Sequence, residues 1–188
     1  MHKTNEVKVW DRFVRFFHWS LVATFALCYL TEDDFMDIHV WSGYAIMLLL
    51  ALRFAWGFLG TEHARFSDFV YRPTTVWQYL KDALSLRAKR YMGHNPAGGA
   101  MIVMFFISLI LATVSGVVLY GADEHAGPLA TLMSGVSEST EELLEEVHEL
   151  FSEFTLLLIL IHIGGVLFES LLHRENLVKA MINGYKKV

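Results

Sequence analysis

Residues 147–172 read VHELFSEFTLLLILIHIGGVLFESLL, a stretch that places two histidines in a segment apolar enough to cross a lipid bilayer. A transmembrane helix needs roughly 20 mostly apolar residues. On such a helix His148 and His162 lie almost four turns apart, so they project from nearly the same face at heights that differ by about 21 Å. One helix therefore offers two imidazole side chains at two depths.

Three more apolar stretches precede this one, in a chain of 188 residues that is 54% hydrophobic. A soluble protein of this size would have too little polar surface to cover four such helices, so the composition favours a membrane protein. We expect one all-α domain over residues 1–188, a multi-pass four-transmembrane-helix bundle. Its spans are expected at about residues 13–31, 37–60, 99–121 and 143–172.

The basic residues indicate the orientation in the membrane. All fifteen Lys and Arg fall into three stretches, residues 1–15, 53–90 and 174–188. Because Lys and Arg gather on the cytoplasmic side of membrane proteins, both termini and the connection between spans two and three are expected in the cytoplasm. In this connection Pro73 is followed by a helical pattern of apolar and basic residues, which predicts a short amphipathic helix on the inner leaflet.

The opposite side is expected to be acidic. The first outer loop contains Glu32, Asp33, Asp34 and Asp37, and nine more Asp and Glu lie in residues 123–153. The simplest interpretation is a solvated acidic loop. Since no base stands among them, these carboxylates also form a field that would attract a basic partner and repel an anion.

Cysteine chemistry is restricted, because Cys28 is the only cysteine and lies inside the first expected span. This excludes an internal disulfide, a covalent CxxCH haem site and any cysteine cluster. Redox chemistry would need a cofactor held by other side chains.

Four of the nine histidines fall in the expected spans, where ionisable groups are costly and therefore indicate function. Helical rise places His39 level with His148 near the outer side, and His18 close in depth to His162 near the inner side. Two pairs of facing imidazoles suit two six-coordinate haem irons, because each pair fills both axial positions. Interhelical hydrogen bonding is the alternative role for these histidines. A shared zinc site is excluded, since ligands about 21 Å apart in height cannot meet one metal.

Small residues and one arginine accompany these histidines. Gly43 lies about one turn after His39, and Gly165 about one turn after His162, where a missing side chain would let a porphyrin approach the backbone. Ordinary packing of small residues between helices is the competing explanation. Arg53, near the inner end of span two, either extends to the membrane surface or pairs with a haem propionate.

Short motifs stand at the histidines and at the ends of the expected spans. They are Val9-Trp10-Asp11-Arg12, Phe17-His18-Trp19, His39 with Gly43-Tyr44, Gly57-Phe58, Gly93-His94-Asn95-Pro96, Val147-His148-Glu149 and His162 with Gly164-Gly165. With these motifs the chain resembles the bacterial cytochrome b561 and nickel-hydrogenase cytochrome b family over essentially its whole length.

The resemblance implies two haem b groups. Their axial ligands would be His18 and His162 on the cytoplasmic side, and His39 and His148 on the periplasmic side. It also implies quinone as the substrate and the bacterial inner membrane as the location, within a respiratory chain.

The expected function is electron transfer between the quinone pool and a periplasmic redox protein. A basic c-type cytochrome is the partner that suits the acidic outer side. One alternative is a superoxide oxidase that reduces quinone, although a negative field would slow an anionic substrate. Another is the cytochrome b anchor subunit of a hydrogenase or dehydrogenase, and a helical transporter without haem is the alternative from a different class. Membrane lipid is a further expected partner, and no nucleic acid is expected.

Overall fold

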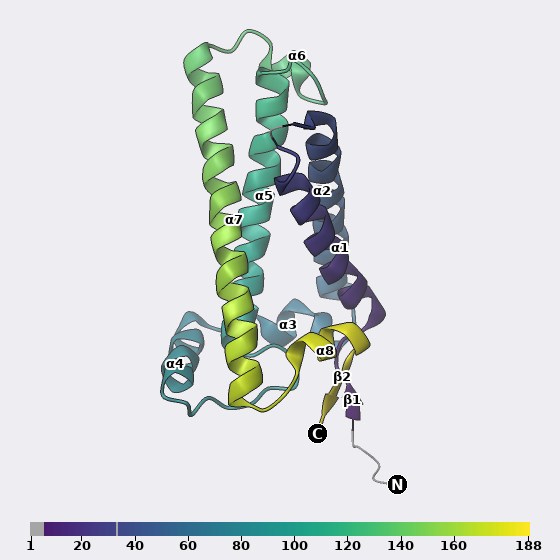
Figure 1. The fold of residues 1–188 in the computed structure, drawn as a ribbon, viewed down its shortest axis with the longest axis vertical. Helices are drawn as coiled ribbons and strands as arrows, with labels where there is room; N and C mark the ends of the chain where they lie inside the picture. Colours follow the sequence, from purple (N-terminus) through teal and green to yellow (C-terminus); the bar gives the residue numbers. More distant parts are fainter. Residues whose placement is uncertain (1–5, 33) are drawn as a thin grey trace. The chain divides into compact units, whose positions relative to one another are not determined.

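The computed structural model describes residues 6–32 and 34–188, so Lys3 and Asp33 of the expected basic and acidic segments lie outside the described residues. Four long helices dominate it (Figure 1). They are α1 (Arg12–Tyr29), α2 (Met36–Leu59), α5 (Pro96–Ala122) and α7 (Glu138–Leu172). The shorter elements are a 3₁₀ turn at Glu62–Ala64, α3 (Phe66–Phe69), α4 (Pro73–Leu84), α6 (Ala130–Met133), α8 (Leu177–Asn183) and the strands β1 (Glu6–Lys8) and β2 (Tyr185–Lys187).

Helices α2, α5 and α7 are long and apolar enough to cross a membrane, so the chain is a membrane protein with three candidate spans among its described residues. Helix α1 has 18 residues but carries Arg12 and Arg15 in its first turn, which makes it less apolar. The first expected span, residues 13–31, is therefore present as a helix, and its crossing of the membrane stays a prediction. Helix α7 begins at Glu138, so its acidic first turns extend the helix beyond the span expected at about residues 143–172.

Helix α4 occupies the position of the expected amphipathic helix. Tyr79 and Ala83 on one side are buried, whereas Trp77 and Leu84 are 62% and 83% exposed. Two apolar side chains are thus free to contact another apolar phase. The placement of α4 on the inner leaflet stays a prediction.

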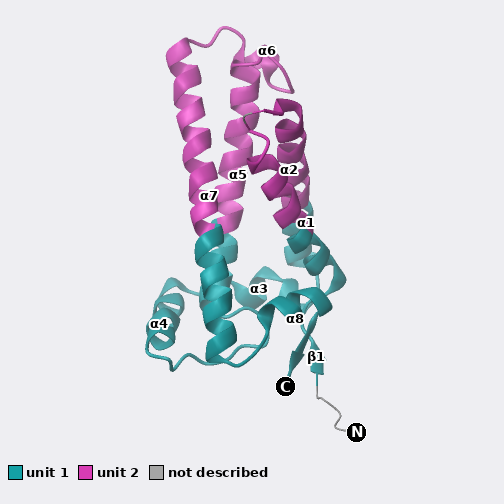
Figure 2. Ribbon diagram, viewed as in Figure 1, with its two compact units in different colours: residues 1–19, 52–104, 159–188 teal, residues 20–51, 105–158 magenta. Residues whose placement is uncertain are grey.

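The chain forms two compact units (Figure 2). Unit 1 comprises the described residues up to 19 together with residues 52–104 and 159–188, and unit 2 comprises residues 20–51 and 105–158. Each of the four long helices contributes one segment to each unit. Every described Lys and Arg belongs to unit 1, so the two units differ sharply in charge.

Unit 1 joins the two ends of the described chain in a short antiparallel sheet. Strand β1 pairs with β2 in the register Glu6 to Lys187, and the N–H groups of Val9 and Trp10 both donate to Gly184 O, at 2.8 and 3.1 Å. Gly184 has a φ of 90°, and a Cβ there would stand 2.7 Å from Trp10 O, so the turn requires glycine. The all-α expectation missed this sheet, because two three-residue strands at opposite ends of the sequence carry no periodic signal.

Asp11 anchors the start of α1 in unit 1. Its Oδ1 accepts the Val14 N–H at 2.8 Å, as an N-cap residue does. Its Oδ2 accepts from Trp56 Nε1 at 2.9 Å and from the Thr61 hydroxyl at 2.7 Å. Burial raises the pKa of Asp11, but these hydrogen bonds outweigh burial and leave that pKa below its ordinary value. One carboxylate therefore ties the first turn of α1 to the end of α2.

Unit 2 has an apolar core between its helix segments. Ile46 and Leu50 of α2 and Leu109 of α5 are buried together. Ser108 of α5 and Thr155 of α7 are both 1% exposed, and their hydroxyls are hydrogen-bonded at 2.6 Å. Small residues let two membrane helices approach closely, and here the two hydroxyls also satisfy each other in apolar surroundings.

The outward surface of the long helices is strongly apolar. Trp41 and Leu48 of α2 are 73% and 61% exposed, and Leu160 and Leu171 of α7 are 62% and 80% exposed. In water such a surface would cause aggregation, whereas lipid tails are as apolar as leucine. The surface therefore agrees with a membrane environment.

Candidate functional site: two histidine pairs

Unit 2 brings together His39 of α2 and His148 of α7. The centroids of the two imidazole rings are 6.0 Å apart, and the ring planes are inclined by 81°. Two imidazole nitrogens bound on opposite sides of one metal, each at about 2 Å, place the ring centroids roughly 6 Å apart. The pair therefore has the spacing of two ligands with one metal between them.

A backbone carbonyl holds each of these rings through Nδ1. His39 Nδ1 lies 2.9 Å from Cys28 O, and His148 Nδ1 lies 2.9 Å from Ala112 O. A carbonyl oxygen only accepts, so each Nδ1 carries the proton and donates it, and Nε2 keeps its lone pair for a metal. The Ser115 hydroxyl also approaches His148 Nδ1, at 3.3 Å.

Gly116 of α5 provides the space for the ring of His148. A Cβ at position 116 would stand 2.7 Å from Cε1 of His148 and 3.0 Å from its Nδ1. These separations are shorter than van der Waals contact. Any larger residue here would displace the imidazole, so α5 positions a side chain that belongs to α7.

Unit 1 brings together His18 of α1 and His162 of α7. The ring centroids are 6.3 Å apart, and the ring planes are inclined by 52°. The indole of Trp19 packs edge-on against His18, with centroids 5.1 Å apart. No hydrogen-bond partner among the described residues reaches the buried Nδ1 of His18. This pair has the spacing of the first, but His18 lacks the carbonyl contact that holds the rings in unit 2.

The donor set of both pairs fits a haem group. Within residues 6–32 and 34–188, no group of three or more His, Cys, Asp or Glu side chains converges to hold a bare metal ion. A porphyrin brings most of the iron ligands itself, so two histidines are enough. No other described residue comes within 4 Å of a Cβ built on Gly43, Gly164 or Gly165, so the helix surfaces at these glycines have room for a flat group.

Arg53 of α2 is 3% exposed and belongs to unit 1. Its Nη2 donates to Ala64 O at 3.0 Å, and its guanidinium carbon lies 5.7 Å from the centroid of the Phe69 ring. A guanidinium that reached the membrane surface would be exposed. Arg53 therefore does not extend to the membrane surface.

His94 packs between two aromatic rings of the same unit. Its ring centroid lies 4.5 Å from that of Trp10 and 5.0 Å from that of Phe69. Burial, followed by the positive charge of Arg53, lowers the pKa of His94 to about 3. The imidazole of His94 is therefore neutral at physiological pH.

Sequence reasoning missed the residues that position the histidines of unit 2. Each residue has a backbone carbonyl, so the acceptors at Cys28 and Ala112 leave no mark in the sequence. Gly116 and its neighbour Ser115 form a small, polar pair inside an apolar span, which is the one signal that points to this place.

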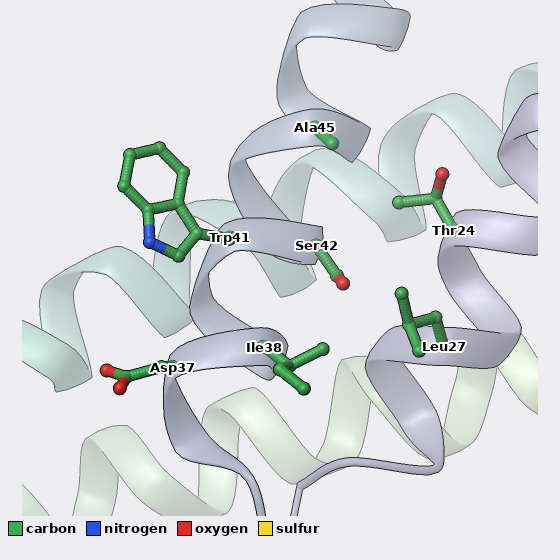
Figure 3. Close-up of a pocket in the computed structure, with 7 residues that line it drawn as sticks. All are labelled: Thr24, Leu27, Asp37, Ile38, Trp41, Ser42 and Ala45. Atoms are coloured by element: carbon green, nitrogen blue, oxygen red, sulfur yellow. The ribbon is translucent and has the colours of Figure 1, made fainter.

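A shallow groove of about 380 Å³ also lies in unit 2, between α1 and α2 (Figure 3). Thr24 and Leu27 line it from α1, and the α2 side is formed by Asp37, Ile38, Trp41, Ser42 and Ala45. None of the four paired histidines lines this groove, so it is separate from both candidate haem sites.

The acidic part of α7 belongs to unit 2. Glu142, Glu145, Glu146 and Glu149 are all exposed. Since no Lys or Arg belongs to unit 2, this surface is negative without local compensation.

The chain is similar to cytochrome subunits of several bacteria. The probable Ni/Fe-hydrogenase B-type cytochrome subunit of Cupriavidus necator is 27% identical over 162 residues, which cover 79% of this chain and 65% of that protein. The protein of the same name from Rhizobium leguminosarum bv. viciae is 26% identical over 161 residues, covering 78% of this chain and 66% of the relative. The probable Ni/Fe-hydrogenase 1 B-type cytochrome subunit of Escherichia coli K12 is 23% identical, with coverages of 79% and 68%. The chain thus spans about two thirds of the length of these relatives.

No solved structure matches the chain significantly.

A family-level match covers more of the chain than these pairwise similarities. The model of the family described as prokaryotic cytochrome b561 matches residues 9–184, which include all four paired histidines. The chain therefore belongs to the prokaryotic cytochrome b561 family, as a helical membrane protein of haem b electron transport.

Proposed function

We propose that the chain is a dihaem cytochrome in which His39 and His148 bind one haem b, and His18 and His162 bind the other. The observation that carries this proposal is the spacing of the two imidazole pairs, whose centroids are 6.0 and 6.3 Å apart. Each pair combines histidines of two different helices, so its members meet through folding and not through sequence proximity. Imidazoles inside apolar helices are costly and indicate function.

Coordination by two histidines suits electron transfer. Haem, when bound, supplies a one-electron redox couple. Two histidines holding the iron would leave no place on it for oxygen or a substrate. In unit 2 the carbonyls of Cys28 and Ala112 keep the rings in the tautomer that binds metal through Nε2.

The charge of the two units supports an orientation in the bacterial inner membrane. The basic residues of unit 1 would face the cytoplasm, with both termini there and α1 crossing the membrane in addition to α2, α5 and α7. The acidic part of α7 in unit 2 would face the periplasm. The haem of His18 and His162 is then the cytoplasmic-side haem, and that of His39 and His148 the periplasmic-side haem.

The relatives favour the role of a cytochrome b subunit that carries electrons between a hydrogenase-type catalytic partner and membrane quinone. These relatives are named as probable B-type cytochrome subunits of Ni/Fe-hydrogenases. This supports the anchor-subunit alternative over the expectation of a soluble periplasmic partner. A basic c-type cytochrome is the second candidate, favoured by the exposed carboxylates from Glu142 to Glu149. The same negative surface disfavours superoxide as the substrate.

Haem content and coordination test the first part of the proposal. Purified protein should contain two haem b per chain by the pyridine haemochrome assay, with electron paramagnetic resonance signals of low-spin ferric haem between two imidazoles. His125→Asn is the control, because His125 is exposed and has a φ of 51° that asparagine tolerates. This variant should keep both haems. Folded protein without haem would contradict the proposal.

Isolation from native membranes tests the partner. A retained hydrogenase or dehydrogenase subunit, with substrate-dependent reduction of the haems, is the expected result. If the partner is a basic c-type cytochrome, Glu145→Gln combined with Glu146→Gln should weaken its binding. The double substitution should also make this binding less sensitive to salt concentration. Retention of a c-type cytochrome in place of a dehydrogenase would favour the second candidate.

A further inference from the structure

Arg53 is a buried cation that takes part in no ion pair among the described residues. It is 3% exposed, and its Nη2 donates to Ala64 O at 3.0 Å. Asp11 acts on it electrostatically, but both oxygens of Asp11 already accept hydrogen bonds from other groups. Burying a guanidinium without a partner is strongly unfavourable. The side chain therefore requires an anion that the described residues do not supply.

The second terminal nitrogen of Arg53 indicates where this anion binds. Nη1 is buried, and no acceptor of the described residues reaches it. The rings of Phe66 and Phe69, with centroids 5.9 and 5.7 Å from the guanidinium carbon, surround the group with apolar surface. A charge-assisted hydrogen bond is strong in such surroundings, because water does not compete for the donor.

The surroundings of Arg53 extend to the histidine pair of unit 1. Phe69 contacts Arg53 on one side and the ring of His94 on the other, the latter with centroids 5.0 Å apart. Both Arg53 and His162 act electrostatically on His94. The buried Nδ1 of His94 also has no hydrogen-bond partner among the described residues. Two buried, unsatisfied nitrogens therefore lie on either side of Phe69, in the unit that also contains His18 and His162.

We infer that Arg53 Nη1 donates to a propionate carboxylate of the haem bound by His18 and His162, and that His94 Nδ1 lies at the same anion site. The inference rests on the proposed haem binding by this pair. Haem b carries two propionates at one edge, so the cofactor itself brings an anion into the unit that holds the arginine. A free phosphate or a lipid headgroup offers the same chemistry at Nη1, but the proposed haem brings its carboxylate with a group bound in the same unit.

This contact has a consequence for the redox behaviour of the unit 1 haem. A nearby positive charge favours the reduced state, which carries one more electron than the oxidised state. Arg53→Gln should therefore lower the midpoint potential of this haem and shift its propionate bands in redox-induced infrared difference spectra. Arg53→Lys keeps the charge but loses the planar fork, so both shifts should be smaller.

The test is a redox titration of the holoprotein with infrared detection, in the wild-type background and in His148→Ala. In the second background only the unit 1 haem should remain, so the changes can be assigned. Arg65→Gln is the matched control, because Arg65 of unit 1 also donates to a backbone carbonyl, Gly60 O at 2.8 Å, but is exposed and is not among the buried side chains with an unpaired nitrogen in the described part of the chain. This control should leave the potential and the propionate bands unchanged.

The outcomes separate this inference from the haem proposal. Unchanged propionate bands and potentials in Arg53→Gln, with two haems bound, would overturn the inference and leave the ligand assignment intact. This result is expected if phosphate or a lipid headgroup, and not a propionate, binds at Arg53. If Arg53→Gln does not fold, unchanged bands in Arg53→Lys would overturn it equally. Wild-type protein without haem would overturn the proposed function instead.

Discussion

The two histidine pairs have nearly equal ring spacings, but their surroundings differ in kind. In unit 2, backbone carbonyls at Cys28 and Ala112 hold both rings through Nδ1, and no Lys or Arg belongs to the unit. In unit 1, the Nδ1 of His18 has no hydrogen-bond partner among the described residues, and a buried arginine lies in the same unit. Spacing alone thus makes two similar sites, whereas hydrogen bonding and charge make them different.

The largest expected effect concerns Gly116, which lies against His148 of the unit 2 pair. Gly116→Val should reduce the haem content from two per chain to one, because the new side chain would occupy the position of the His148 ring. The remaining haem should show the spectrum of the unit 1 site. Two haems per chain in a folded Gly116→Val variant would show that haem binding does not require the His148 ring to lie against residue 116.

Replacing one histidine at a time should reveal two different midpoint potentials. A histidine that donates Nδ1–H to a carbonyl is a more basic ligand and stabilises the oxidised iron, whereas the Arg53 cation favours reduction. The haem left in His162→Ala should therefore have a lower midpoint potential than the haem left in His148→Ala. Potentiometric titration of both variants measures this order. Equal or reversed potentials would contradict the contrast drawn between the two units.

Acid should destabilise unit 1 by breaking the ion pairs of Glu175. Glu175 pairs with Arg90 at 2.9 Å and with Lys186 at 3.4 Å. Burial raises the pKa of Glu175, but the hydrogen bond from Arg90 and the charge of Lys186 outweigh burial and place that pKa below its ordinary value. A carboxyl whose pKa is depressed by folding stabilises the fold above its unfolded pKa, and this contribution is lost as the pH falls through the folded pKa.

Thermal unfolding in detergent between pH 3 and 7, in steps of about one unit, measures this sensitivity. Glu175→Gln should lower the melting temperature at neutral pH and flatten its dependence on acid. Glu145→Gln, at an exposed position of unit 2, is the control and should follow the wild type. An unchanged acid profile in Glu175→Gln would assign the sensitivity to other groups.

The smallest effect is expected from Ser115. Its hydroxyl lies 3.3 Å from His148 Nδ1, but the carbonyl of Ala112 is the closer acceptor at 2.9 Å. Ser115→Ala should keep both haems and weaken binding of the unit 2 haem by no more than about 1 kcal/mol. Haem retention during extraction with a competing haem-binding protein measures this difference. Loss of the haem would show that the hydroxyl, and not the carbonyl, orients the ring.

The helices and the histidine pairs follow from local features of the sequence. Apolar length predicts the long helices, and the fixed rise of a helix relates the depths of His148 and His162, so the two pairs met as expected. The membrane crossing of α1 does not follow, because Arg12 and Arg15 dilute its apolar character. The assignment of the four histidines as haem ligands stays a prediction.

Other features depend on contacts that no local pattern encodes. Strands β1 and β2 pair across almost the full length of the chain. The contact between Gly116 and His148 depends on how α5 packs against α7, which single-helix periodicity does not report. The sequence shows Arg53 as an arginine inside an apolar helix, but only its burial and its unpaired nitrogen distinguish between its two possible roles.

Haem content in paired substitutions tests the central claim most directly. His39→Ala combined with His148→Ala removes both ligands of one proposed haem, so this protein should retain one haem per chain, as each single variant does. His148→Ala combined with His162→Ala removes one ligand of each haem and should leave none. If both double variants retained the same number of haems, the histidines would not act in these pairs.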